Sequence, residues 1–387
     1  MIPKPDQALI NQLVELRKTL HRHPELSGKE AQTASRIKKF LKETKPDQLI
    51  EKLGGNGLLA LFDSGQPGAE LLLRCDTDAL PIQEVNDFAH RSENDGVAHK
   101  CGHDGHTAIL AGVAALLGRH RPKTGRVALL FQPDEETGRG AEKVLHDEAF
   151  AALNPDMVFA LHNLPGFDEK AVVVKKGSFA SASKGMIITL KGKSSHAAHP
   201  EQGNSPVKVV TGLLDGLPNI PNMKESFEDF CLVTIIHAHL GEKAFGTSPG
   251  DAVVMATLRS YLDDDMEKLT AMAEYLVDHL CRKYDIASEI HYTEVFPATV
   301  SDPEALELVK NAARQNQSQL LEIDEPFRWS EDFGHFTMQY PGALFGLGAG
   351  KDHPGLHNNH YDFNDNIIET GVNIFMNIIR QKNKFDV

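Results

Sequence analysis

Residues 101–106 read Cys-Gly-His-Asp-Gly-His, and this hexapeptide places a thiol, two imidazoles and a carboxylate in one short loop. Its two glycines let the backbone turn sharply. Core packing does not require such a composition, whereas thiolate, imidazole and carboxylate groups are the side chains that bind divalent transition metals. The hexapeptide alone is also compatible with a buried cysteine beside surface histidines. Further metal-binding residue types elsewhere in the sequence are needed to distinguish a metal site from this simpler explanation.

Four short apolar runs, at 71–75, 127–131, 157–161 and 343–347, read as buried strands, and polar residues follow each of them. In an open α/β sheet, ligands bind beyond the carboxyl ends of the strands. Each of the polar residues by itself is equally compatible with a helix cap, a solvated turn or a surface histidine. Together with the hexapeptide they form five segments that could converge on one site. The residues that follow the runs are Asp76, Asp78, Asp134, Glu135, Glu136, His162, His353, His357 and His360.

Glu135 and Glu136 are adjacent, and neighbouring side chains generally point in different directions. One carboxylate can therefore bind a metal while the other faces a substrate. A metal ion lowers the pKa of a water molecule towards about 7, and a free carboxylate beside it can accept the proton and pass it to a leaving amine. The pair is thus typical of a metal-dependent hydrolase.

The alternation of strand-like and helical patterns in the first half predicts an α/β fold with a largely parallel central sheet. Asp6 is a suitable N-cap for a first helix, and the stretch 27–30 reads as a capping box that opens a second. After about Gly185 the pattern changes to that of a small α+β unit. Because metal-type residues occur on both sides of this unit, we expect one catalytic domain with an insertion.

The composition restricts the class of protein. A chain of 387 residues favours two domains, and its net charge of −14 argues against nucleic acid or an anionic membrane as the main partner. The four cysteines form no CxxC pair, the first residues have no apolar signal core, and no apolar run reaches the roughly 18–20 residues that span a bilayer. We therefore expect a cytoplasmic enzyme.

Seven stretches together resemble the M20 metallopeptidase superfamily, in its amidohydrolase branch of aminoacylases, hippurate hydrolases and auxin-conjugate amidohydrolases. The hexapeptide, the Glu-Glu pair and the Ser-Glu-Asp-Phe block are the most specific of them. The matching stretches are 20–26, 74–81, 101–106, 132–136, 195–200, 330–333 and 356–358.

The resemblance implies a site for two divalent metal ions, with Cys101 as the ligand that bridges them. Glu135 would be the general base, and Asp78 would orient a metal-bound histidine. Thiolate and imidazole ligands suit zinc, while the carboxylates also admit manganese, nickel or cobalt. The implied metal ligands are Cys101, His103, Glu136, His162 and His357.

The resemblance further implies that helices cover both faces of the catalytic sheet. It also implies a discontinuous catalytic domain at 1–182 and 294–387, and an inserted α+β lid and dimerisation domain at 183–293. In the lid, His196 matches a histidine that polarises the scissile carbonyl, in cis or in trans across a homodimer. Arg259 matches a position that holds the substrate carboxylate, although a surface ion pair would explain it nearly as well. His199 and the segment 236–250 depart from the pattern of the branch, which leaves the substrate open.

These residues lead us to expect a metal-dependent amidohydrolase that cleaves N-acyl amino acids into a carboxylic acid and a free amino acid. A dipeptidase or carboxypeptidase would share every catalytic part and would differ by a pocket for a free α-amino group. A catalytically silent metal- or ligand-binding protein on the same scaffold is the third possibility. Retention of Glu135, Asp78 and all five implied ligands argues against the silent protein.

Overall fold

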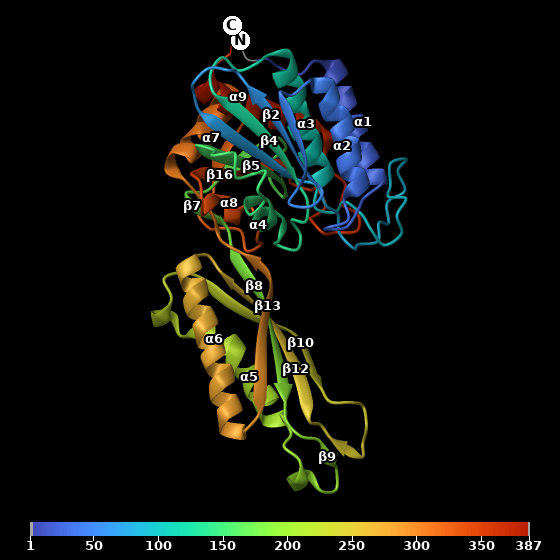
Figure 1. Ribbon diagram of the computed structural model, residues 1–387, viewed down its shortest axis with the longest axis vertical. Helices are drawn as coiled ribbons and strands as arrows, with labels where there is room; N and C mark the ends of the chain where they lie inside the picture. Colours follow the sequence, from blue (N-terminus) through green and yellow to red (C-terminus); the bar gives the residue numbers. More distant parts are fainter. Residues whose placement is uncertain (1–2, 386–387) are drawn as a thin grey trace. The chain divides into compact units, whose positions relative to one another are not determined.

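The computed structural model describes residues 3–385, which form two compact units (Figure 1). The first unit extends to Phe179 and resumes with Thr299–Glu325 and residues 331–385. The second unit comprises Ala180–Ala298 and Pro326–Ser330. It is slightly longer at both ends than the insertion expected at 183–293, and it also takes in the short segment that precedes Glu331.

An eight-stranded sheet in the order β1-β2-β4-β3-β5-β16-β6-β15 forms the centre of the first unit. Its four central strands, β4, β3, β5 and β16, run parallel, which confirms the α/β fold class. The sheet as a whole is mixed, because β1, β2 and β4 pair antiparallel and so do β16 and β6. A tight turn at 54–56 joins β1 to β2, and such a turn can only connect antiparallel strands. The strands are β1 Gln48–Leu53, β2 Gly57–Asp63, β3 Glu70–Asp76, β4 Arg126–Gln132, β5 Met157–Pro165, β6 Val172–Val174, β15 Leu320–Glu322 and β16 Gly342–Gly350.

Helices cover both faces of this sheet. The five long helices share one apolar core with alternate residues of the central strands, for example Leu71 and Leu73 of β3. The residue after Leu73, Arg74, points to the other face, where it contacts Asp332 just before the short helix α8. Asp6 caps α1 as expected, because its carboxylate accepts from the Leu9 amide at 2.8 Å. The helices are α1 Gln7–Arg22, α2 Ala31–Thr44, α3 His103–Arg119, α4 Gly140–Leu145, α7 Pro303–Gln315, α8 Gly334–Thr337 and α9 Ile368–Asn383.

Helix α3 begins inside the hexapeptide and is buried from His103 to Leu117. Gly102 precedes it with φ +95, a left-handed conformation that glycine adopts without strain. A Cβ atom on Gly105 would lie 2.2 Å from the ring of Phe363, so only glycine fits at this contact. The two glycines therefore fix where the helix starts and how closely it packs, and both features position His103.

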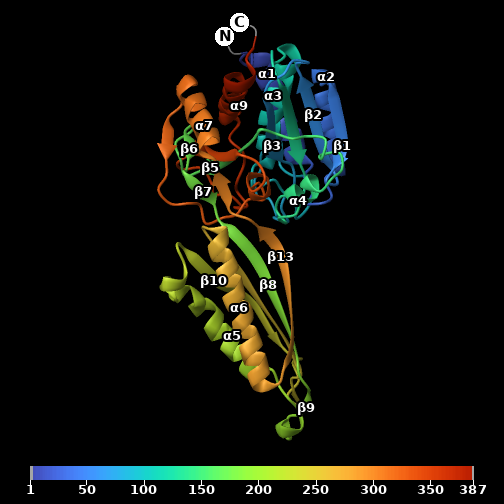
Figure 2. The ribbon, with the colours of Figure 1, turned by 60° about the vertical axis from the view of Figure 1, so that its left-hand side comes forward.

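The second unit (Figure 2) contains an antiparallel sheet, and its strand order is β10-β12-β8-β13. Alternate residues of β12 are buried, as expected for a sheet with one covered face. Helices α5 and α6 pack on that face and contribute to a separate apolar core. A two-stranded ladder, β9 with β11, carries His196 opposite Thr247. The elements are β8 Ala182–Lys191, β9 Ser195–His196, α5 Val207–Asn219, β10 Cys231–Leu240, β11 Thr247–Ser248, β12 Asp251–Ser260, α6 Asp263–Tyr284 and β13 Ala287–Phe296.

Among residues 3–385, no helix is both long enough and apolar enough to cross a membrane.

Candidate metal site

The five residues implied as metal ligands come together at the carboxyl-terminal edge of the central strands. Cys101, His103 and His162 form one group whose ligand atoms all lie within 4.8 Å of one another. Cys101, Glu136 and His357 form a second group within the same limit. Cys101 is common to both groups, and its sulfur lies 3.5 Å from Nε2 of His162. The geometry therefore offers two adjacent positions for a cation with one shared thiol.

Two of the histidines are oriented by hydrogen bonds from their Nδ1 atoms. Nδ1 of His103 donates to the backbone carbonyl of Asp78 at 3.0 Å, and Nδ1 of His162 donates to the carbonyl of Asn163 at 2.8 Å. In each ring the proton on Nδ1 leaves the lone pair on Nε2. Histidine ligands to metals are held by such bonds through the other ring nitrogen.

Buried polar atoms in this cluster require a partner that the described residues do not supply. Nε2 of His103 and Oε1 of Glu136 are shielded from solvent and accept no hydrogen bond from residues 3–385. Burial raises the pKa of the Cys101 thiol well above its ordinary value and raises that of Glu136 to about 7. A cation removes both costs, because it stabilises the thiolate and the carboxylate. The residues present thus fit a pair of divalent ions.

Two segments of the site hold a residue other than glycine in the left-handed backbone region. Asp134, directly before the Glu-Glu pair, has φ +61, and His357 has φ +62. The His357 amide is fixed by a 2.7 Å hydrogen bond to the carbonyl of Lys100, the residue before Cys101. Strained backbone of this kind persists where surrounding contacts enforce it, and it clusters at functional sites.

Asp78 links three parts of the cluster. Its carboxylate accepts from the Ser27 hydroxyl at 2.7 Å, from the Glu136 amide at 3.0 Å and from Nδ1 of His103 at 3.2 Å. The capping box expected at 27–30 is therefore wrong, because the Ser27 hydroxyl is used by Asp78 and α2 begins only at Ala31. Asp78 orients His103 and fixes the backbone of Glu136.

Glu135 lies beside both ligand groups but belongs to neither of the groups that contain Cys101. Its carboxylate is close to the ligand atoms of His103 and Glu136, and it accepts from the Asp332 amide at 3.3 Å. Burial, and then the charges of Glu331 and Glu136, raise its pKa well above the ordinary value for glutamate. A carboxylate with this environment is suited to accept a proton.

The sequence reasoning missed the buried cation that organises this side of the site. Arg74 bonds to Asp76 at 2.8 Å, to Glu331 at 3.0 Å and to Asp332 at 2.6 Å. Asp76 in turn accepts from His106 at 2.7 Å. Arg74 and the Ser-Glu-Asp-Phe block were both recognised as motifs, but no local pattern indicates that they touch.

Two of the three histidines after β16 do not join the cluster. His353 bonds to the carbonyl of Pro354 and His360 is exposed, so only His357 belongs to a ligand group. His196 and Arg259 lie in the second unit, on β9 and β12.

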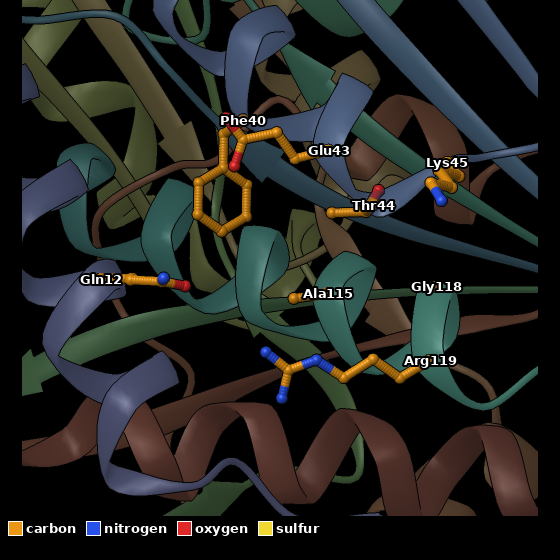
Figure 3. A pocket seen from close by; sticks show the side chains of 8 residues that line it. All are labelled: Gln12, Phe40, Glu43, Thr44, Lys45, Ala115, Gly118 and Arg119. Atoms are coloured by element: carbon orange, nitrogen blue, oxygen red, sulfur yellow. The ribbon is translucent and has the colours of Figure 1, made fainter.

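A hollow of about 360 Å³ between α1, α2 and α3 is unrelated to this cluster (Figure 3). It adjoins the last turn of α3, whereas His103 is the first residue of that helix. At about 1.5 Å per residue, the length of α3 separates the two by roughly 20 Å. The residues around the hollow include no histidine or cysteine; they are Gln12, Phe40, Glu43, Thr44, Lys45, Ala115, Gly118 and Arg119.

Behind the hexapeptide, a second buried network fixes Asp104. Its carboxylate bonds to Nδ1 of His21 at 2.8 Å, and Nε2 of His21 bonds to Glu84 at 3.1 Å. Burial lowers the pKa of His21, but the two carboxylates outweigh burial and raise that pKa to about 9. His21 is therefore charged at neutral pH and holds the start of α3 against α1.

Comparisons with known proteins show the family of this chain. Residues 72–381 match the model of peptidase family M20/M25/M40. A hippurate hydrolase of Campylobacter jejuni is 30% identical over 92% of both chains, and an N-acetyl-L-cysteine deacetylase of Bacillus subtilis is 30% identical over 90% of this chain and 83% of the relative. The structure of a dinuclear metal-binding peptidase of the M20 family from Bacillus subtilis covers 96% of this chain and 98% of its own, with a TM-score of 0.82 and 26% identity.

The fold and the cluster are those of a hydrolase whose catalytic unit is built from helices and a mixed sheet and carries candidate ligands for two metals. The chain belongs to peptidase family M20/M25/M40 and is a hydrolase that acts on amide bonds.

The charge on His21 predicts a specific dependence of stability on pH. Its pKa is higher in the folded protein than the ordinary 6.5, so its contribution is complete below about pH 6.5 and is lost as the pH rises through about 9. The shift corresponds to a free energy on the order of 3 kcal/mol. For metal-free protein, the difference in free energy of unfolding between wild type and His21→Gln should be largest near pH 6 and should shrink towards pH 9.5. Urea denaturation at several pH values measures it, with His120→Gln, at an exposed position, as the control. A difference that grows with pH would contradict the assignment.

Proposed function

We propose that this chain is a metal-dependent amidohydrolase that cleaves N-acyl amino acids into a carboxylic acid and a free amino acid. The observation that carries the proposal is the buried Glu135 carboxylate beside two ligand groups that share Cys101. In a protein that only binds metal, a further buried carboxylate with a raised pKa beside Glu136 would destabilise the fold without serving the metal site.

The proposed mechanism assigns a separate task to each residue. Cys101, His103 and His162 would hold one divalent ion, and Cys101, Glu136 and His357 the other. Ions at these positions supply Lewis acidity, which polarises a carbonyl and lowers the pKa of a water molecule.

Glu135 accepts the proton of the attacking water and then delivers it to the amine that leaves. Its raised pKa suits both halves of this transfer, because the group must hold the proton between the two steps. The amide of Asp332 keeps the carboxylate oriented. Zinc, manganese, nickel and cobalt are all compatible with the donor set.

Arg259 supports a substrate with a free carboxylate. Its Nη1 atom donates to the carbonyl of Arg328 and the hydroxyl of Ser330, and no carboxylate among residues 3–385 pairs with it. Burial lowers its pKa without an acidic partner to compensate, so a bound anion would stabilise the cation. The surface ion pair considered as the alternative for Arg259 is not present in the described residues. The names of the two relatives, hippurate hydrolase and N-acetyl-L-cysteine deacetylase, describe substrates of this class.

The hydrogen bonding of His196 supports the proposal that this residue donates a hydrogen bond to the developing oxyanion. Its Nδ1 atom accepts from the Ala198 amide at 3.0 Å, so the neutral ring carries its proton on Nε2. A donor aimed at a developing oxyanion typically contributes about 10²–10³-fold to the rate.

We further propose a cytoplasmic homodimer that pairs through residues 183–293. Strand β10 is an edge of its sheet, and Ile236, Leu240 and Phe245 in and after it are exposed. Exposed apolar side chains at an unpaired edge favour contact with a second chain. All four cysteines are free thiols, which agrees with a reducing compartment.

Replacing Glu135 tests the proposed reaction most simply. Glu135→Gln should lower the turnover of N-acetyl and N-benzoyl amino acids by about 10²–10⁴-fold, because the general base is lost. Its metal content should match that of the wild type, whereas Glu136→Gln should lose metal. Glu142→Gln, on the exposed face of α4, is the matched control. Near wild-type turnover by Glu135→Gln would refute the role, and a wild type that prefers dipeptides over every N-acyl amino acid would favour the dipeptidase.

Arg259→Ala should selectively weaken the binding of substrates that carry a free carboxylate. Loss of hydrogen bonds to a charged group costs roughly 1.5–3 kcal/mol, so KM should rise about ten- to a hundredfold. Amidated forms of the same substrates, which are poor to begin with, should change little. Steady-state kinetics on both forms provide the measurement, with Arg282→Ala on the exposed face of α6 as the control. Equal losses for carboxylate and amide substrates would exclude Arg259 as the residue that holds the substrate carboxylate.

Mixed dimers test whether His196 acts in trans. Glu135→Gln and His196→Ala chains are each expected to be inactive alone. If His196 serves the partner's site, a mixed dimer holds one site with both residues intact and regains part of the activity. Sedimentation of the wild type as a monomer, or mixed dimers without recovery, would remove the trans arrangement and leave the hydrolase proposal standing.

A further inference from the structure

The loop that carries Cys101 is pressed against two polar side chains that bind no substrate and no ion in the proposed mechanism. A Cβ atom on Gly102 would lie 2.4 Å from Nδ2 of Asn163 and 2.5 Å from the hydroxyl of Tyr361. Both side chains are fully buried. We call this pair, Asn163 and Tyr361, the clamp.

The clamp forms a directed chain of hydrogen bonds that ends on the backbone of the shared cysteine. The Tyr361 hydroxyl donates to Oδ1 of Asn163 at 2.6 Å, and Nδ2 of Asn163 donates to the Cys101 carbonyl at 2.7 Å. Because the hydroxyl occupies Oδ1, it fixes which end of the amide faces Cys101. The hydroxyl of Tyr361 therefore acts on the cysteine through Asn163.

The backbone of Asn163 is tied to the other side of the same ligand group. Its carbonyl accepts from Nδ1 of His162 at 2.8 Å, and its amide donates to Nε2 of His106 at 3.0 Å. His106 is itself oriented by Asp76 at 2.7 Å. One residue thus fixes the ring of His162 through its backbone and the main chain of Cys101 through its side chain.

Tyr361 also connects the clamp to the loop that carries His357. Its amide donates to the Asn358 carbonyl at 2.9 Å, and its carbonyl accepts from Nζ of Lys100 at 2.7 Å. The segments that bear Cys101, His162 and His357 therefore meet at the clamp, although they are far apart in the sequence.

We propose that Asn163 and Tyr361 are positioning residues that hold the Cys101 backbone where its sulfur serves both ligand groups. The inference rests on the proposed metal-dependent function and adds to it a requirement outside the ligands themselves. Residues that orient metal ligands typically contribute about 10–100-fold to metal affinity or activity.

The test is a cobalt titration of chelator-treated protein, followed by the thiolate-to-cobalt charge-transfer absorbance and by the thermal midpoint of the metal-free form. Tyr361→Phe removes only the hydroxyl and should weaken cobalt binding by about tenfold. It should also change the charge-transfer intensity per bound ion, which a purely structural role would not move. Tyr340→Phe, at a partly buried tyrosine of the same unit, should leave both quantities unchanged.

A double-mutant cycle sharpens the result. Asn163→Ala keeps the backbone bonds to His162 and His106 and should weaken cobalt binding at least as much as Tyr361→Phe. Because Tyr361 acts through Asn163, adding Tyr361→Phe to that variant should weaken binding no further.

The clamp would be overturned if Tyr361→Phe bound cobalt with the affinity and the absorbance of the wild type. It would also be overturned if adding Tyr361→Phe to Asn163→Ala lowered cobalt affinity by a further tenfold. If Tyr361→Phe does not fold, the absorbance of Asn163→Ala decides alone, and an unchanged signal overturns the clamp. Wild-type protein that binds no cobalt would overturn the proposed function and the clamp together, so the two failures are distinguishable.

Discussion

The burial of the Cys101 thiol where two sets of ligand atoms meet is the constraint on which the rest of the site depends. A buried thiol stays protonated because its thiolate is poorly solvated, and the neighbouring Glu136 carboxylate raises the cost further. The surrounding residues supply donors for cations on both sides of the sulfur. Cations at these positions would satisfy the buried atoms of His103 and Glu136 that have no hydrogen-bond partner among residues 3–385.

The charges around this centre are organised by buried cations of the chain itself. Arg74 neutralises the carboxylates of Asp76, Glu331 and Asp332 on one side, and Arg17 with His21 neutralises Asp104 on the other. Burial, and then the carboxylates around it, raise the pKa of Glu135, whereas for Asp76 burial is outweighed by His103, His106 and Arg74, which hold its pKa well below its ordinary value. Acidic residues from three separate stretches therefore differ in their surroundings: Asp76 and Asp104 hold histidines, whereas Glu135 has no histidine or arginine among residues 3–385 hydrogen-bonded to it and is assigned to proton transfer in the proposed mechanism.

The sequence predicted those features that are encoded locally. The hexapeptide, the Glu-Glu pair and the histidines after buried runs are each recognisable within a few residues, and the carboxyl ends of parallel strands bring them to one edge. The network around Arg74 was not predictable, because its partner Asp332 lies 258 positions away and no local sequence pattern indicates that the two residues are in contact. The capping box failed for the related reason that the Ser27 hydroxyl has a distant partner, Asp78, that competes with the local helix. The antiparallel edge of the sheet was missed because a buried strand reads alike in either direction.

The central claim is that two ions share the Cys101 sulfur, and anomalous diffraction from crystals of the zinc-loaded protein tests it most directly. We expect two peaks at the zinc absorption edge, both within bonding distance of Sγ of Cys101, one beside His103 and His162 and the other beside Glu136 and His357. A single peak, or two peaks of which one lies away from Cys101 among Glu135, Glu331 and Asp332, would contradict it.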